Sequence, residues 1–327
     1  MDRVTARRPA FVAALKERVR GEVRESEGLA RYSTYRIGGP ATVLLPARAE
    51  DIAAAVQLAT GEGVGCFVLG LGSNLLLPDE GLDALVIRLG KGLDELVRDG
   101  NRWRIGAGLP APLAARRTGE AGQAGLHKFV GVPGTVGGGV YMNAGCHGGD
   151  WSEVVEQVTV IDADGDLRVL ERREIPFSYR RSGLDGLIVV GTTVALRPEN
   201  PATLSAELSE LFRWRQEGTP FNQPCCGSVF QNPGGPSWKR KEGPRTAGQL
   251  IEAAGLKGLR VGAAEVSPMH ANYFVNTGGA TAADVRGLIA RVQQAVEEKF
   301  GVRLETEVKL IGSRGNYLNI NSVNGER

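Results

Sequence analysis

Side chains that bind metals or form disulfides are scarce in this sequence of 327 residues. It has four cysteines and three histidines. Cys66 and Cys146 are isolated, and the adjacent Cys225 and Cys226 have poor geometry for a shared disulfide or a tetrahedral metal site. The chain has no CxxC, and its histidines show no ligand spacing. We therefore expect four free thiols in a reducing compartment and no metal site.

The sequence also lacks a large excess of charge of one sign, and it lacks long apolar runs. The 39 basic and 37 acidic residues leave a formal net charge of +2, so no bulk field favours a nucleic acid or a membrane as partner. The longest apolar run near the N-terminus is Phe11–Leu15, too short for a signal peptide or a membrane span. Phe11, Leu15 and Val19 recur at helical spacing and predict a docking helix. We expect a cytoplasmic protein, and the sequence identifies no protein partner.

Glycine, by contrast, is abundant. The 46 glycines are about twice the usual share of roughly 7%, and they cluster at 61–72 and 131–149. Clustered glycine is typical of backbone that turns sharply or approaches a ligand closely. The chain is too long for one comfortable core, so we expect two or three domains.

The hydrophobic pattern predicts an α+β fold. Strands and helices alternate between residues 41 and 121, and an Asp-Ala-Asp-Gly turn at 162–165 predicts a hairpin. A proline-rich break at 197–201 is the candidate domain boundary. The second α+β unit has a long helix that begins at Thr281 with a capping-box pattern and ends at Gly301.

Two glycine-dense segments suit a ligand. Val68–Leu76 follows a short apolar strand, and its backbone N–H groups, with Ser73 and Asn74, suit a phosphate. A plain tight turn fits this loop equally well. Phe129–Gly145 holds six glycines among apolar residues, a composition that disfavours both a helix and a solvated linker. It predicts backbone lying flat on a large, partly apolar cofactor, with a buried turn as the alternative.

Three segments together make the sequence recognisable. Tyr35–Ala41 (Tyr-Arg-Ile-Gly-Gly-Pro-Ala), Gly70–Leu76 and Gly131–Gly145, in this order, resemble the UDP-N-acetylenolpyruvoylglucosamine reductase family of peptidoglycan precursor synthesis. The resemblance implies a two-part FAD-binding domain of the vanillyl-alcohol-oxidase (PCMH) type, followed by a smaller α+β substrate-binding domain. The expected limits are 1–29 for an N-terminal helix or extension, 30–198 for the FAD-binding domain with subdomains of about 30–95 and 96–198, 199–312 for the substrate-binding domain and 313–327 for a flexible tail.

The resemblance implies non-covalent FAD, with NADPH as the hydride donor. Gly70–Leu75 would receive the FAD pyrophosphate, and Gly131–Gly138 with Asn143–Gly145 would line the isoalloxazine. The residues assigned to the cofactor in this way are Arg36, Gly70, Gly72, Ser73, Asn74, Leu75, Gly131, Val132, Pro133, Gly134, Thr135, Gly137, Gly138, Asn143 and Gly145.

The implied reaction is reduction of an enolpyruvyl ether. A hydride adds to one alkene carbon and a proton to the next, and the attached carboxylate must hold the developing enolate charge. Flavin N5 supplies the hydride, a step that no side chain performs. The protein must therefore supply a cation for the carboxylate and a positioned acid.

The cation is expected in Phe177–Ser182, which resembles the family's Tyr-Arg-x-Ser. A guanidinium matches a planar carboxylate as a fork. On the residues alone, Arg180 and Arg181 are equal candidates, and a solvated arginine pair is the plain alternative. The resemblance selects Arg180, and Tyr179 beside it is expected to contact the substrate.

The acid is expected in Gly227–Pro233, which resembles the family's Gly-Ser-Val-Phe-Lys-Asn-Pro, whose serine donates the proton. A serine hydroxyl is a very weak acid and protonates only something as basic as an enolate carbon. Without the resemblance, Ser228 is a turn residue. Asn232 of the same motif is expected to bind substrate. Nothing nearby in the sequence activates Cys225 and Cys226, which we interpret as structural.

The third catalytic residue is expected in a predicted closing strand, Val302–Ile311. Alternation puts Glu305, Glu307 and Lys309 on one face and cannot choose between the glutamates. The family's Glu-Val-Arg-x-Ile-Gly ending matches 307–312, which selects Glu307 as catalytic and Lys309 as a substrate contact. A carboxylate would repel the enolate, so Glu307 acts protonated or orients the proton supply of the serine.

The sequence departs from the family pattern at a few positions. Gln231 stands where Lys is frequent, Lys309 where Arg is frequent and Glu265 where Gln is common. These changes affect the contacts expected for the substrate carboxylate and diphosphate. Residues 236–245 form a basic loop that either touches the diphosphate or is solvated. The short span between the arginine and serine motifs favours the shorter, type II branch of the family.

Two other functions share parts of this pattern. An alcohol or aldehyde oxidase on the same flavin domain often tethers its flavin through His or Cys, for which His127, His147 or Cys146 are available. A nucleotide-binding protein without activity would not need all three catalytic candidates. The sequence therefore predicts an NADPH-dependent, FAD-mediated reduction of UDP-N-acetylglucosamine enolpyruvate to UDP-N-acetylmuramate.

Overall fold

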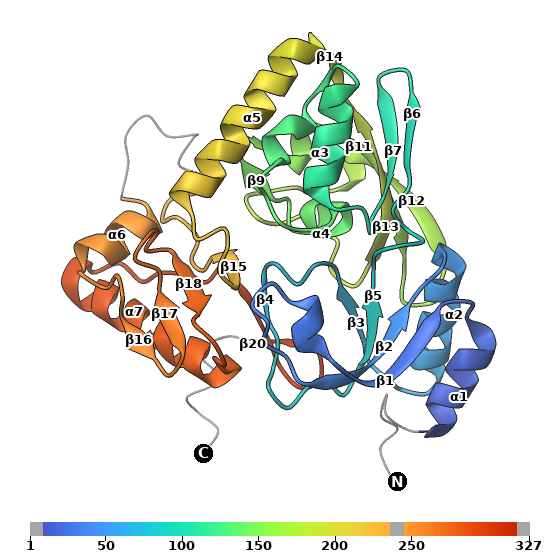
Figure 1. Cartoon of the computed structure of the whole chain (residues 1–327). Coiled ribbons are helices and arrows are strands. Elements are labelled where there is room, and N and C mark those ends of the chain that lie inside the picture. Colours follow the sequence, from blue (N-terminus) through green and yellow to red (C-terminus); the bar gives the residue numbers. More distant parts are fainter. Residues whose placement is uncertain (1–8, 236–244, 319–327) are drawn as a thin grey trace. The chain divides into compact units, whose positions relative to one another are not determined.

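The computed structural model describes residues 9–235 and 245–318, and the chain divides into two compact units (Figure 1). Each unit has its own apolar core and mixes helices with sheets, which confirms the α+β class. Residues 319–327 of the expected tail and most of the basic loop lie outside the described residues. The first unit comprises Met1–Glu27, Ala41–Leu71 and Asp83–Trp214, and the second comprises Gly28–Pro40, Gly72–Leu82 and Arg215–Arg327.

A four-stranded sheet in the first unit has the order β1-β2-β5-β3. β2 (Pro40–Leu45) and β3 (Cys66–Leu69) both run parallel to β5 (Leu85–Arg88). The connection from β2 to β3 contains α2 (Ala49–Gly61), which buries one apolar stripe. Parallel strands need such a crossover, and the apolar runs of β2 and β5 fit burial on both faces. The predicted strands and helix of this region are confirmed to within one or two residues.

The N-terminal region forms a helix and an edge strand (Figure 1). α1 (Pro9–Arg18) buries Phe11, Val12 and Leu15 in the core of the first unit, which confirms the docking helix. The sequence pattern does not predict β1 (Glu22–Gly28), because its residues are charged instead of alternating. β1 lies at the edge of its sheet, where charged side chains discourage pairing with other chains.

The other large sheet of the first unit is antiparallel, with the order β12-β11-β13-β7-β6. The predicted hairpin is confirmed, because the Gly165 N–H donates to the Asp162 carbonyl in the turn between β11 and β12. Its strands are β6 (Leu96–Asp99), β7 (Arg102–Gly106), β11 (Val155–Ile161), β12 (Leu167–Glu171) and β13 (Ile188–Ala195). The unit also contains α3 (Ala111–Glu120) and two short ladders, β8 (Gln123–Ala124) with β14 (Arg197–Pro198) and β9 (Gly145–Cys146) with β10 (Gly149–Asp150).

The glycine-dense segment contains a short helix, so the prediction that residues 129–145 are not helical is wrong. α4 (Val136–Tyr141) begins after Thr135, whose hydroxyl caps its first turn. Gly139 lies so close to the Trp151 indole that a Cβ atom would be 2.4 Å from Nε1. Glycine costs about 1 kcal/mol per residue in a helix, but here it allows the helix to pack closely, and this packing outweighs the propensity.

The second unit is built around an antiparallel sheet with the order β15-β18-β17-β16. In α7 (Ala282–Phe300), Thr281 and Asp284 form the predicted capping box and Gly301 ends the helix with a φ of 66°, so both expectations are confirmed. The other elements are α5 (Pro201–Gly218), which leads from the first unit into the second, α6 (Ala247–Ala253), β15 (Cys225–Ser228), β16 (Arg260–Val261), β17 (Ala264–Val266) and β18 (Tyr273–Asn276).

The C-terminal strand is shorter than the predicted 302–311. Only β19 (Lys309–Ile311) is a strand, because the chain changes its pairing partner at this point. Residues 305–308 pair with the segment 229–231, and β19 then joins a different sheet. That sheet has the order β20-β19-β4, with β4 (Leu75–Leu76) parallel and β20 (Tyr317–Leu318) antiparallel to β19.

The variant Gly139→Ala tests the close packing of α4. We expect a loss of about 1–3 kcal/mol in the free energy of unfolding, because the added methyl must displace the Trp151 indole. Gly61→Ala in α2 is the matched control, since a Cβ there meets nothing within 4 Å, and it should be neutral or slightly stabilising. Chemical denaturation measures both, and equal stabilities would contradict the packing account.

Candidate active site

Backbone pairing places two of the predicted catalytic residues on adjacent segments of the second unit. Ser228 is the last residue of β15. The Glu307 N–H donates to the carbonyl of Val229, the next residue, at 2.7 Å. Phe230, which follows Val229, forms an antiparallel β-bridge with Thr306, which precedes Glu307. The backbone of Glu307 is therefore paired with Val229, the residue that follows Ser228, although the two segments are far apart in the sequence.

A buried asparagine fixes the serine segment from its other side. Asn272 is 4% exposed, and its side-chain amide accepts from the Phe230 N–H at 3.0 Å and donates to the Phe230 carbonyl at 2.8 Å. Its backbone carbonyl accepts from the Val229 N–H at 2.8 Å. Loss of this amide would leave buried backbone groups unpaired, which is costly. Asn272 thus supports the segment that carries Ser228.

Tyr273 lies directly opposite Ser228 in the sheet, so the two side chains share a face. Arg215 Nη1 donates to the Tyr273 hydroxyl at 2.5 Å, and the His270 imidazole contacts the tyrosine ring edge-on, with centroids 4.7 Å apart. Burial and the charge of Arg215 lower the pKa of His270. No sequence pattern singled out Arg215, which lies near the C-terminal end of α5.

The two cysteines before Ser228 are protonated thiols. Burial raises the pKa of both Cys225 and Cys226. Cys226 is 2% exposed and lies against the buried Tyr35 hydroxyl, whose pKa is raised by its own burial. A thiol with a raised pKa is a poor nucleophile, which agrees with a structural role. All four cysteines of the chain are free thiols.

Arg180 belongs to the first unit and is the third residue of a tight turn. Ser178 and Arg181 exchange two backbone hydrogen bonds of 2.8 and 3.1 Å, and Arg180 between them has a φ of 58°. Its Nη2 donates to the Gly145 carbonyl at 3.1 Å, and its guanidinium lies 5.1 Å from the centroid of the Tyr179 ring. Arg180 therefore contacts the glycine-dense segment, whereas Arg181 is exposed.

The glycine loops of the first unit fit a large cofactor. Gly70 follows β3 directly, and a Cβ there would lie 2.7 Å from the Thr135 hydroxyl, so the first loop touches the start of α4. Pro133 and Gly138 on the second segment are exposed. Two adjoining stretches of bare backbone, one after a strand and one at the start of a helix, suit the diphosphate and the ring system of FAD.

Some residues that the resemblance assigns to FAD make structural bonds in the second unit. The Asn74 side-chain nitrogen donates to the Glu307 carbonyl at 3.2 Å, and its backbone carbonyl accepts from the Lys309 N–H at 2.9 Å. Leu75 continues this pairing as part of β4. Arg36 is exposed and has a φ of 57°. The contacts of the whole assigned set with FAD stay a prediction.

Two positions expected to act on the substrate have local partners. The Asn232 side-chain oxygen accepts from the Ala247 N–H at the start of α6, at 3.1 Å. Glu265, a departure from the family pattern, pairs with Arg260 of the same hairpin at 2.6 Å. Tyr179 and Lys309 are partly buried. In the basic loop, Lys239, Arg240 and Lys241 lie outside the described residues.

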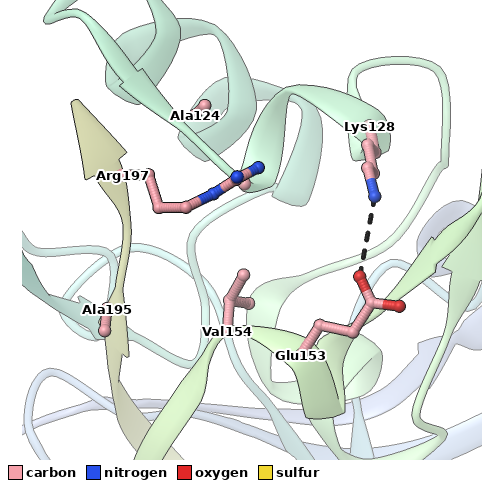
Figure 2. Close-up of a pocket in the computed structure, with 7 residues that line it drawn as sticks. Ala124, Lys128, Glu153, Val154, Ala195 and Arg197 are labelled. Carbon is pink, nitrogen blue, oxygen red and sulfur yellow. Dashed lines mark ion pairs between the residues drawn. The ribbon is translucent and has the colours of Figure 1, made fainter. Parts of the chain in front are cut away.

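A separate surface pocket of about 200 Å³ lies in the first unit. Figure 2 shows Lys128 and Glu153 pointing toward one another, and their charged groups are 3.6 Å apart. The pocket contains none of the predicted site residues, so it is distinct from the predicted site. Its lining residues are Ala124, Gly125, Lys128, Glu153, Val154, Ala195 and Arg197.

Residues 9–235 and 245–318 lack two further features. No helix in these ranges is both long enough and apolar enough to cross a membrane. No group of three or more His, Cys, Asp or Glu side chains within them could hold a metal ion.

The fold and the glycine loops define a flavin-binding protein with a distinct C-terminal domain. A family model described as FAD binding domain matches residues 40–171. A second model, described as UDP-N-acetylenolpyruvoylglucosamine reductase, C-terminal domain, matches residues 219–311. The predicted order of an FAD-binding domain followed by a second α+β domain is therefore confirmed.

Whole-chain relatives identify the family. The UDP-N-acetylenolpyruvoylglucosamine reductase of Halalkalibacterium halodurans is 42% identical over 308 residues, which are 93% of this chain and 99% of the relative. Reductase 2 of Symbiobacterium thermophilum is 43% identical over 295 residues, 89% of this chain and 93% of the relative. The crystal structure of the Thermus caldophilus enzyme is 34% identical, with a TM-score of 0.74 over 89% of this chain and 99% of that one. The chain belongs to the UDP-N-acetylenolpyruvoylglucosamine reductase family, and the resemblance is confirmed.

NMR titration of the histidines tests whether Arg215 lowers the pKa of His270. We expect the His270 imidazole to titrate below the ordinary value of about 6.5, so that its contribution to stability is full above this pH and is lost as the pH falls. Arg215→Gln removes a neighbouring charge and should raise the pKa of His270. His127, whose lowered pKa is caused by burial and not by Arg215, is the control. An unchanged His270 pKa in the variant would contradict this arrangement.

Proposed function

We propose that this protein reduces UDP-N-acetylglucosamine enolpyruvate to UDP-N-acetylmuramate in the synthesis of peptidoglycan precursors. The relatives support this activity over nearly the whole chain. The observation that supports it best is the backbone pairing of Glu307 with Val229, the residue that follows Ser228. A proton donor as weak as serine needs a neighbouring group that orients or resupplies its proton, and we propose that Glu307 is this group.

FAD supplies the hydride when it is bound, and NADPH renews it. The chain's own contribution is the backbone at Gly70 and the start of α4, where Gly70 packs too closely on Thr135 to carry a Cβ and Gly138 is exposed. We propose that FAD is held there without a covalent bond. The use of NADPH and the cytoplasmic location are part of the same proposal and rest on the family and the sequence.

Arg180 binds the carboxylate of the enolpyruvyl group in this proposal. A guanidinium stays charged at physiological pH and forms two parallel hydrogen bonds with a carboxylate. As the hydride adds to the alkene, negative charge spreads onto the carboxylate oxygens and their attraction to Arg180 grows. Arg180 therefore stabilises the transition state more than the ground state, which is the condition for catalysis. The Tyr179 ring beside its guanidinium restricts the motion of the side chain.

Ser228 donates the proton to the enolate carbon. Glu307 acts in its protonated form, since a carboxylate would repel the enolate, and it orients the serine hydroxyl or replaces its proton. The transfer leaves a serine oxyanion, which positive potential stabilises. Arg215 is held by Tyr273 on the face that carries Ser228 and supplies this potential.

Ser228→Ala separates the two halves of the reaction. We expect NADPH to reduce the flavin at the wild-type rate, because hydride entry does not need this hydroxyl. Reoxidation of the flavin by the enolpyruvyl sugar nucleotide should slow by about 10²–10⁴-fold. Anaerobic rapid mixing, followed by flavin absorbance, measures both rates. Cys225→Ala, in the same strand, is the control and should keep both rates. Normal reoxidation in Ser228→Ala would rule out Ser228 as the donor.

A further inference from the structure

Asn143 holds the glycine-dense segment and the Arg180 turn together. It is 2% exposed. Its side-chain nitrogen donates to the Ser178 carbonyl at 2.9 Å, and its side-chain oxygen accepts from the Ser152 N–H at 3.0 Å. Both ends of the amide therefore bind backbone groups of the protein. The resemblance assigns Asn143 to FAD, but its side chain is engaged in joining three segments of the first unit.

The bond from Asn143 is one of three between the same two segments. The Ser182 hydroxyl donates to the Tyr141 carbonyl at 2.6 Å. Arg180 Nη2 donates to the Gly145 carbonyl at 3.1 Å. Alternate residues of the glycine-dense segment are thus bonded to the segment 178–182: residue 141 to its end, 143 to its beginning and 145 to its middle. This spacing fixes the position of the turn along the segment.

The turn needs such support because Arg180 has an unfavourable backbone. Its φ of 58° lies in the left-handed region, which costs a non-glycine residue of order 1–3 kcal/mol unless surrounding structure enforces it. A free turn would relax toward an ordinary conformation and swing the guanidinium away from Gly145. The bonds from Asn143 and Ser182 flank Arg180 on both sides, so they oppose this relaxation.

Few other side chains could take the place of Asn143. Its own φ is 41°, and among non-glycine residues asparagine and aspartate are the most tolerant of this region. Aspartate could accept from the Ser152 N–H, but an ionised carboxylate cannot donate to the Ser178 carbonyl. Glycine could adopt the backbone but would make neither bond. Asparagine satisfies the backbone and both partners.

We propose that Asn143 is a positioning residue for Arg180, which it presents to the substrate carboxylate in a fixed orientation, and that Ser182 assists it. This inference rests on the proposed function, because it presumes that Arg180 binds the carboxylate. It changes the role of Asn143 from a flavin contact to a support for the group that recognises the substrate.

The test is Asn143→Gly, which keeps the left-handed backbone and removes both side-chain bonds. Ser182→Ala removes the hydrogen bond to the Tyr141 carbonyl, which holds the same turn. This variant provides the test if Asn143→Gly does not fold. Thr192→Val is the matched control, since Thr192 is 3% exposed in β13 and its hydroxyl donates to the Gln157 carbonyl at 2.7 Å. All three variants lose a buried polar contact within the first unit.

The decisive measurement is a ratio of affinities in the FAD-loaded enzyme. UDP-N-acetylmuramate carries the carboxylate and UDP-N-acetylglucosamine lacks it, so the ratio of their dissociation constants reports carboxylate recognition. We expect wild-type enzyme and Thr192→Val to prefer UDP-N-acetylmuramate strongly. Asn143→Gly and Ser182→Ala should lose about tenfold or more of this preference, the size of a charged hydrogen bond. The affinity of the apoprotein for FAD, measured by flavin fluorescence, should stay at the wild-type value.

The possible outcomes separate the inference from the proposed function. A lower affinity for FAD with an unchanged preference would show that Asn143 contacts the flavin and would overturn the inference. Wild-type values for both quantities in Asn143→Gly, or in Ser182→Ala alone if the first variant does not fold, would overturn it as well. Equal wild-type affinities for the two sugar nucleotides would contradict the role of Arg180 itself, and the inference would fall with it.

Discussion

The hydrogen bond from the Glu307 N–H to the Val229 carbonyl is the interaction on which the proposed catalytic arrangement depends. It joins the end of the chain to the strand that carries Ser228, and Asn272 holds that strand from the other side. Backbone bonds of this kind tolerate little variation in geometry. In the proposed reaction, this pairing fixes the backbone of Glu307 relative to the segment that carries Ser228, which a flexible loop could not do.

In the first unit, the glycine-dense segment brings exposed backbone and the charged side chain of Arg180 together. Close packing forces glycine at 139, where a Cβ would strike Trp151. The same segment then uses its alternate residues to hold the turn of Arg180. The composition that suits a flat cofactor and the bonds that hold Arg180, the proposed carboxylate-binding residue, thus belong to one stretch of chain. Strain at Arg180 is tolerated because this stretch enforces it.

Periodicity in the sequence predicted most elements of the fold, and motif resemblance selected the candidate residues. The two wrong predictions of elements have physical causes, as does the unpredicted strand β1, whose residues are charged. The helix α4 was not predicted because tertiary packing overrides the poor helix propensity of glycine. The strand predicted over 302–311 was too long because the chain changes its pairing partner at Lys309. The contacts of Arg215 and the supporting role of Asn143 could not be predicted from the sequence, because each depends on contacts between residues that are distant in the sequence. Glu307 could be chosen over Glu305 only by resemblance.

In the proposed reaction, electrons leave the reduced flavin for the alkene of the sugar nucleotide. The most direct test is a single turnover of wild-type enzyme, reduced with one equivalent of NADPH under anaerobic conditions and mixed with UDP-N-acetylglucosamine enolpyruvate. The account predicts complete reoxidation of the flavin and one equivalent of UDP-N-acetylmuramate, identified by mass spectrometry. Flavin that stays reduced until oxygen is admitted, with the sugar nucleotide unchanged, would contradict it.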